Sequence, residues 1–154
     1  MNSTVKLDRV YALTGVAAII IGASVSAFTA KQPSTLAMWA SAYLVLVVGV
    51  AQIFLASVVA QLMQASSRKL LYQMFALFNA GNILVILSSV LKYSGYENHV
   101  MVTTVGAALV IAALGEFGWL LRRAKASQLR TWAYAMIALL IVTALIGIFL
   151  AGIH

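Results

Sequence analysis

The sequence predicts an all-α fold, a polytopic transmembrane helical bundle with five transmembrane helices, and three observations lead to it. Hydrophobic residues make up 64% of the 154 residues and charged residues only 8%, whereas a soluble domain has roughly 45–50% and 25%. The apolar residues fall in five runs, each near the ~20 residues that cross a bilayer. The segments between the runs are short and carry most of the basic residues. We therefore expect a single integral membrane domain over residues 1–154.

The five runs place the predicted helices at residues 10–30, 36–63, 70–92, 99–121 and 131–151. The first run follows Lys6 and Arg9 and contains Val25-Ser26-Ala27, which resembles a signal peptide with a small-residue cleavage site. We interpret it as a retained first transmembrane helix. Pro33, the only proline, predicts a tight turn after this helix.

Small or polar residues recur at helical spacing in the first two runs. Three share one face of the first helix and three share one face of the second: Gly22, Ser26 and Ala30, then Gly49, Gln52 and Ala56. A face of small residues lets a neighbouring backbone come close. These faces therefore predict helix-to-helix packing.

The third run, from Tyr72 to Tyr93, carries two amides near its middle. Steps of three and four residues put seven residues on one face: Tyr72, Phe75, Asn79, Asn82, Ile86, Ser89 and Tyr93. An amide in hydrocarbon needs a hydrogen-bond partner. We therefore expect this face to contact protein, with the third helix central and in contact with the second, fourth and fifth.

Four polar side chains are predicted to lie at similar depth in the membrane. Counted at about 1.5 Å per residue from the basic ends of their helices, Gln52, Asn79, Asn82 and Thr143 lie roughly 14–18 Å deep. One interpretation of this polar midplane layer is interhelical hydrogen bonding, worth ~0.6 kcal/mol per contact. The other is a small polar site for a solute, a quinone headgroup or an ion.

Glu116 is the only acidic residue within a predicted helix. It ends a face of small residues in the fourth run, namely Thr104, Ala108, Ala112 and Gly115. A charged side chain at this depth is costly unless it is paired, hydrated or protonated. Because Glu116 lies only about 8 Å from the helix end by rise per residue, an ion pair with the basic rim is expected. The alternatives are a proton or cation relay and a contact with another subunit.

Lysine and arginine gather on one side of the five crossings. The N-terminal segment, residues 64–69 and residues 122–130 carry eight of them, whereas the other side carries Lys31 and Lys92. The positive-inside rule then puts the N-terminus in the cytoplasm and the C-terminus outside. A bacterial cytoplasmic membrane is the expected location, with anionic headgroups contacting the basic cytoplasmic face.

Several function classes are disfavoured. A net charge of +7 in a soluble chain would indicate nucleic acid, but here the basic residues flank apolar runs, where they set topology; we expect no nucleic-acid partner. The chain has no cysteine and therefore no thiolate site or thiol nucleophile. Glycine-rich nucleotide loops, Ser-His-Asp arrangements, zinc motifs and a long-period internal repeat are all absent from the sequence. No catalytic residue is assigned.

The predicted outer side holds the two histidines. His99 begins the fourth helix and His154 follows the fifth, with Glu97 and Met101 near the same surface. Imidazole and thioether ligands suit copper, so these four residues form a candidate metal site. Neither histidine lies inside a helix at matching depth, which disfavours an internal bis-histidine haem.

Three functions fit these observations. The favoured one is a non-catalytic accessory or assembly subunit of a larger membrane complex, or a homo-oligomer, because loops are minimal and small-residue faces abundant. The second is a small-solute or ion permease or channel that uses the midplane layer. The third is a membrane redox or copper-binding protein that uses the outer histidines.

Overall fold

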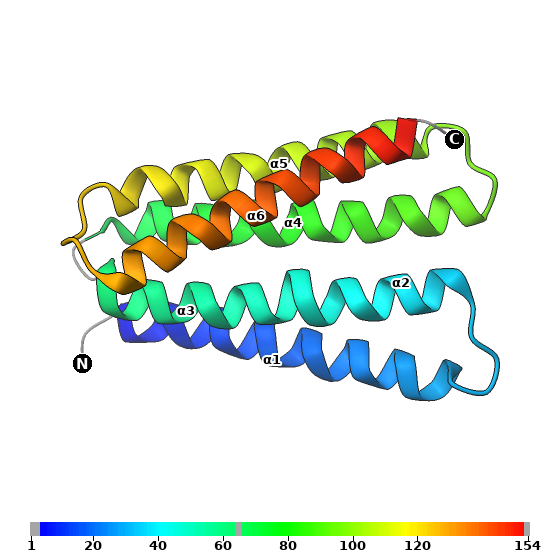
Figure 1. Ribbon diagram of the computed structural model, residues 1–154, viewed down its shortest axis with the longest axis horizontal. Coiled ribbons are helices and arrows are strands. Elements are labelled where there is room, and N and C mark those ends of the chain that lie inside the picture. The colour runs from blue at the N-terminus through cyan, green and yellow to red at the C-terminus, as the bar shows by residue number, and fades with distance from the viewer. Residues whose placement is uncertain (1–3, 64–65, 153–154) are drawn as a thin grey trace. The chain divides into compact units, whose positions relative to one another are not determined.

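The computed structural model describes residues 4–63 and 66–152, and these residues form long helices joined by short loops (Figure 1). Five helical segments are long and apolar enough to cross a membrane. The prediction of an all-α chain with five potential transmembrane helices is confirmed. By contacts the chain divides into two compact units, residues 1–64 and 65–154. A single bundle that joins both units stays a prediction, but within unit 2 the fourth predicted helix, and not the third, is the middle one.

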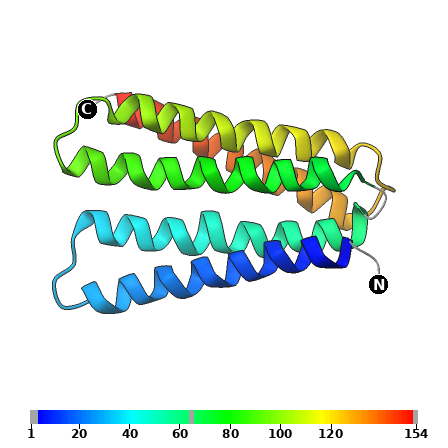
Figure 2. The same cartoon turned by 180° about the vertical axis from the view of Figure 1, so that it is seen from behind.

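Unit 1 is a helical hairpin. Its first helix, α1, spans Thr4–Thr29. After the turn at Pro33 the second segment comprises α2 (Thr35–Tyr43), η1 (Leu44–Val50) and α3 (Ala51–Leu62) without a break. Ser34 begins this segment as an N-cap, because its hydroxyl accepts a hydrogen bond from the Ala37 amide at 3.2 Å. The two arms lie side by side in both ribbon views (Figures 1 and 2).

The middle of the second arm is a π-helix, η1, in which the backbone is more widely wound than in an α-helix. Two residues of η1 are buried, Val48 and Gly49. Such segments accommodate an extra residue inside an otherwise regular helix. The π-helix therefore decides which residues of this arm face α1 beyond Tyr43.

The two arms of unit 1 cross where glycines meet. A Cβ atom added to Gly15 would lie 2.7 Å from the Gly49 carbonyl oxygen and 3.1 Å from the Ile53 amide nitrogen. Towards the turn, the Ser41 hydroxyl donates a buried hydrogen bond to the Gly22 carbonyl at 2.9 Å. The helices thus touch backbone to backbone, as small residues allow in apolar surroundings.

Unit 2 contains three helices, α4 (Arg68–Tyr93), α5 (His99–Leu121) and α6 (Gln128–Gly152). The middle helix, α5, packs against both α4 and α6, and Figure 2 shows α4 and α5 running side by side along their length. At about 1.5 Å per residue, the 26 residues of α4 exceed the roughly 30 Å of a hydrocarbon core. Each helix of unit 2 can therefore span a bilayer.

The α4–α5 pair crosses at a second pair of glycines. A Cβ atom on Gly81 would lie 2.6 Å from the Gly106 carbonyl oxygen and 2.9 Å from the Val110 amide nitrogen. Towards the connecting loop, the Ser88 and Thr103 hydroxyls form a buried hydrogen bond of 2.7 Å. Close backbone approach and one polar contact again join the helices.

A glycine ends α4. Gly95 has φ +76°, a conformation that costs any residue with a Cβ about 1–2 kcal/mol. This conformation turns the Gly95 amide to the Lys92 carbonyl and the Tyr96 amide to the Leu91 carbonyl, both at 3.0 Å. The pair of bonds is a Schellman motif, which satisfies the last carbonyls of α4 and starts the chain back towards α5.

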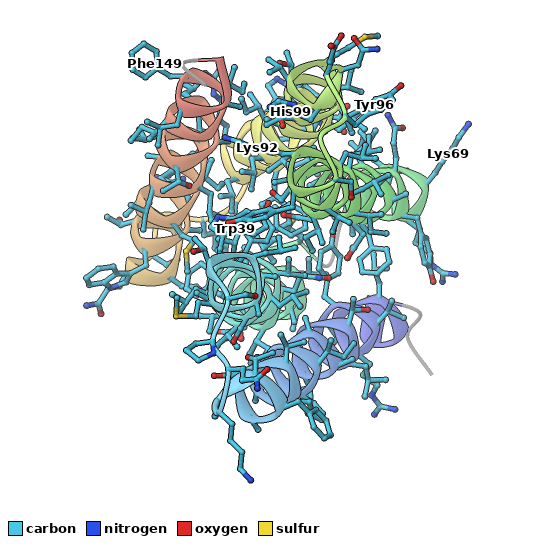
Figure 3. All side chains as sticks on the ribbon, turned by 90° about the vertical axis from the view of Figure 1, so that its right-hand side faces the viewer. Trp39, Lys69, Lys92, Tyr96, His99 and Phe149 are labelled. Carbon is cyan, nitrogen blue, oxygen red and sulfur yellow. The ribbon has the colours of Figure 1, made fainter. Side chains whose placement is uncertain are left out.

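The third helix of unit 2 is tied to α5 near their shared loop. The Ser127 hydroxyl accepts a hydrogen bond from the Arg130 amide at 3.2 Å and so caps α6. The Tyr134 hydroxyl donates to the Gly118 carbonyl of α5 at 3.3 Å. Beyond this end much of α6 is exposed, including Phe149, which points away from the helices in Figure 3.

The observed helices differ from the predicted ranges mainly at their starts. Helix α1 begins at residue 4 rather than 10, and α6 at residue 128 rather than 131. In both cases the helix continues from the apolar run into flanking polar and basic residues. Long charged side chains tolerate such positions, because their stems lie along the helix while their charged groups reach water.

The predicted small-residue faces are used in part. Gly49, Gln52 and Ala56 are buried, as their shared face predicts. On α1, Gly22 meets the second arm closely. Ser26 and Ala30 are exposed instead, because the arms approach most closely further from the turn.

Candidate functional site

The amide side chains of α4 are held by their own helix. The Asn79 Nδ2 donates to the Phe75 carbonyl at 2.8 Å, and the Asn82 Nδ2 donates to the Phe78 carbonyl at 2.7 Å. Asn82 is 2% exposed. Each amide thus has an acceptor one turn earlier, which satisfies a donor that hydrocarbon cannot.

The buried face of α4 differs from the face predicted by its polar stripe. It comprises Leu71, Met74, Phe78, Gly81, Asn82 and Ser88. Asn82 belongs to both faces, whereas Tyr72 and Tyr93 at the ends of the stripe are exposed. The reason is the crossing at Gly81, which turns the small residue, and not the most polar side, towards α5.

The other two members of the predicted midplane layer differ in burial. Gln52 in α3 is fully buried. Thr143 in α6 is exposed, and its hydroxyl donates to the Leu140 carbonyl of its own helix at 2.9 Å. A layer that joins Gln52 to Asn79, Asn82 and Thr143 would link unit 1 to unit 2, and it stays a prediction.

Glu116 lies in the last third of α5, within a helix long enough to cross a membrane. Its Oε2 atom is buried and has no hydrogen-bond partner within residues 4–63 and 66–152. Arg123, two turns further along, lies instead over the Trp119 ring, with the guanidinium carbon 4.5 Å from the ring centroid. Over the described ranges, the expected ion pair between Glu116 and the basic rim is not formed.

The small residues that precede Glu116 face away from the α4–α5 crossing. Thr104, Ala108, Ala112 and Gly115 are exposed, and an added Cβ on Gly115 would meet no atom within 4 Å. The opposite side of α5 is buried on its neighbours through Gly106, Val110 and Phe117. Helix α5 therefore has two narrow faces, one covered and one open; we call the open one the outer face of α5.

The end of unit 2 at which α4 begins and α5 ends is strongly basic. Five exposed cationic side chains lie there, and we call this surface the basic end: Arg68, Lys69, Arg122, Arg123 and Lys125. The side chain of Lys69 extends away from α4 in Figure 3. Across the described chain, none of these five forms an ion pair with a carboxylate. The surface thus carries uncompensated positive charge.

The opposite end of unit 2 contains the candidate metal ligands. The His99 Nδ1 donates to the Tyr96 carbonyl at 2.9 Å, and Nε2 is buried without a partner in the described part of the chain. Lys92, Tyr96 and His99 all lie at this end (Figure 3). Glu97 and Met101 are exposed.

These residues do not gather into a metal site within the described ranges. Met101 follows His99 by two helical positions, so the two side chains point to nearly opposite sides of α5. No group of three histidine, cysteine, aspartate or glutamate side chains comes together in residues 4–63 and 66–152. His154 lies outside the described residues, so its part in a copper site stays a prediction.

Sequence reasoning missed the residues on which the helix contacts depend, Gly15, Gly81 and Gly106, although glycine inside an apolar run was the available signal. No protein-family model, curated protein sequence or solved structure matches the chain.

Proposed function

We propose that this protein is a non-catalytic accessory or assembly subunit of a larger membrane complex, which it joins through the outer face of α5. The observation that carries this proposal is the combination on one helix of an open row of small residues and Glu116. Lipid tails gain nothing from small residues, whereas a partner helix can approach them closely.

The carboxylate supports a protein partner. A buried polar oxygen without a donor costs roughly 1–3 kcal/mol, and more when it is charged. The Oε2 atom of Glu116 has no donor within the described residues. Because Oε2 is covered by this chain's own atoms, the Glu116 side chain has to turn towards the outer face of α5 before an amide, hydroxyl or basic group of a partner helix beside Gly115 can donate to it.

The α4 amides support a structural role over a permease site. Asn79 and Asn82 each donate to a carbonyl of their own helix. These bonds hold the two side chains against their own helix, and the permease interpretation receives no support from them.

The test is co-purification from the native membrane. The tagged full-length chain is extracted in mild detergent and examined by native mass spectrometry, beside the Gly115→Leu and Glu116→Gln variants. We expect the unaltered chain to carry one set of membrane partners at fixed stoichiometry. Gly115→Leu should lose them, because its side chain fills the space a partner helix needs, and Glu116→Gln should weaken them.

Gly147→Leu is the matched control, because Gly147 is also exposed on a helix of unit 2 and an added Cβ there meets no atom within 4 Å. It should retain the partners. A chain that is monodisperse alone in mild detergent, or equal loss of partners in the Gly115 and Gly147 variants, would contradict the proposal.

We further propose that the chain lies in a bacterial cytoplasmic membrane with its N-terminus in the cytoplasm. The support is the distribution of lysine and arginine, eight on one side of five successive crossings and two on the other. A reporter fused to the C-terminus should be active only outside the cytoplasm. Activity inside the cytoplasm would refute this topology.

A further inference from the structure

The basic end of unit 2 carries a large charge excess next to two exposed indole rings. Of the two acidic residues in unit 2, Glu97 lies at the opposite end and Glu116 lies within the span of α5. Trp119 and Trp132 are 49% and 61% exposed near the basic end. Indole rings favour the headgroup level of a bilayer, so the basic side chains just beyond them lie at the depth of lipid phosphates.

One of these cations, Arg123 in the turn that follows α5, lies against an aromatic ring of α5. Arg123 lies over the face of Trp119, a cation–π contact that limits the rotation of the guanidinium. The side chain stays exposed in this position. A planar guanidinium fixed in this way presents paired N–H groups that match the geometry of a phosphate.

The loop that carries Lys125 is also fixed. The Arg130 guanidinium Nη1 donates to the Ala124 carbonyl at 2.7 Å, across the turn between α5 and α6. The Arg130 guanidinium therefore binds a backbone carbonyl of the protein, whereas the side chains of Arg122, Arg123 and Lys125 are exposed. The three outward cations lie within four residues on a braced turn.

We propose that the basic end binds the phosphate of an anionic phospholipid, with Arg123, Arg122 and Lys125 as its principal contacts. Two observations favour a lipid over a free phosphate ion. The cations directly follow an apolar span that ends at Leu121, and Trp119 beneath Arg123 offers an apolar surface to the lipid glycerol and upper chains. The bound lipid neutralises charge that no carboxylate of the described chain neutralises.

The test measures retained lipid. The full-length protein in mild detergent is mixed with phosphatidylglycerol or with phosphatidylcholine of the same chains, and native mass spectrometry counts bound lipid. We expect a clear preference for phosphatidylglycerol. Since each cation near an anionic surface contributes about a fivefold gain in affinity, Arg123→Gln should lower that preference about fivefold and Arg123→Lys should restore part of it.

Lys92→Gln is the matched control, because it removes one exposed lysine from the opposite end of the same helices. It should leave the preference unchanged. Equal losses in Arg123→Gln and Lys92→Gln would overturn the proposal. Displacement of phosphatidylglycerol by millimolar inorganic phosphate would overturn it too, since the site would then serve the free ion.

Substitution of Arg123 also removes its contact with Trp119, so the fold of the variant is checked by gel filtration and circular dichroism. If Arg123→Gln does not purify as a folded protein, Lys125→Gln carries the same test, because Lys125 is exposed in a loop. An unchanged lipid preference in that variant overturns the proposal.

Discussion

Helix α1 crosses the second arm of unit 1 in the same way as α4 crosses α5 in unit 2, although the sequences of the two pairs are unrelated. In unit 1 the carbonyl and amide that approach Gly15 belong to Gly49 and to a residue four positions later. In unit 2 the groups that approach Gly81 belong to Gly106 and, again, to a residue four positions later. One crossing geometry therefore serves both pairs, although the chain has no repeat visible in its sequence.

The pairs differ in how the crossing is secured near the loop. In unit 1 the Ser41 hydroxyl donates to a backbone carbonyl. In unit 2 the Ser88 and Thr103 hydroxyls bond to each other, and each also lies within bonding distance of a carbonyl of its own helix. Close approach of glycines is thus the shared requirement, whereas the accompanying hydrogen bond varies in chemistry.

The largest expected effect on stability comes from adding a Cβ atom at the glycines where the helices cross. Gly15→Ala and Gly81→Ala place a Cβ atom against the carbonyl oxygen of the opposite helix. Because backbone, and not a flexible side chain, must move, each should lower the free energy of unfolding by about 1–3 kcal/mol. Denaturant unfolding in detergent micelles measures both losses, and Gly115→Ala and Gly147→Ala, which meet open space, should show none. A loss in only one unit would break the equivalence of the two crossings.

Substitutions in the two connecting loops should have smaller effects on stability than those at the crossings. Gly95→Ala forces a Cβ into a positive-φ conformation and should cost about 1–2 kcal/mol. Pro33→Ala in the corresponding loop of unit 1 only frees the unfolded chain and should cost about 0.4–1 kcal/mol. Thermal unfolding of the two variants side by side measures the difference. A Pro33→Ala loss equal to or above that of Gly95→Ala would contradict this ranking.

The smallest expected effect is that of the hydroxyl contacts. A double-mutant cycle with Ser88→Ala and Thr103→Val should give a coupling of ~0.6 kcal/mol, as for other hydrogen bonds between transmembrane helices. Ser41→Ala should cost a similar amount, because the Gly22 carbonyl lies inside a helix and keeps its backbone partner. The same unfolding assay serves for all four variants, and a coupling of several kcal/mol would show that the polar contact, and not the glycines, secures unit 2.

Apolar run length was sufficient to predict the five helices, because a crossing requires about 20 such residues whatever they contact. Run length does not predict which glycine lies at a crossing. Gly81 and Gly106 face each other because the Gly95 loop sets the stagger of α4 against α5. In unit 1, η1 shifts the second arm in a way that no local pattern indicates. Glycine positions were visible in the sequence, but their pairing depends on these longer-range offsets.

Of the candidate site, the sequence alone could predict the position of Glu116 but not the contacts of its neighbours. Glu116 stands out in sequence because a carboxylate in an apolar run is costly. In the structure its Oε2 atom is buried and has no hydrogen-bond partner among the described residues. Its lack of an ion pair was not predictable, because Arg123, two turns further on, contacts Trp119 instead. The direction of the Arg123 side chain towards the Trp119 ring is not given by spacing alone.

The π-helix in unit 1 determines how this hairpin tolerates changes of length. Gly15 and Gly22 on α1 are seven residues apart, whereas their contacts Gly49 and Ser41 are eight apart. Seven residues bring an α-helix back to the same face, and the wider turns of η1 absorb the eighth. Deletion of one residue between Leu44 and Val48 would therefore leave both contacts in register on a plain α-helix, whereas the same deletion between Gly81 and Ser88 would rotate one of them away from α5. Unit 1 thus has a place where its chain can shorten by one residue, and the α4–α5 pair has none between its two contacts.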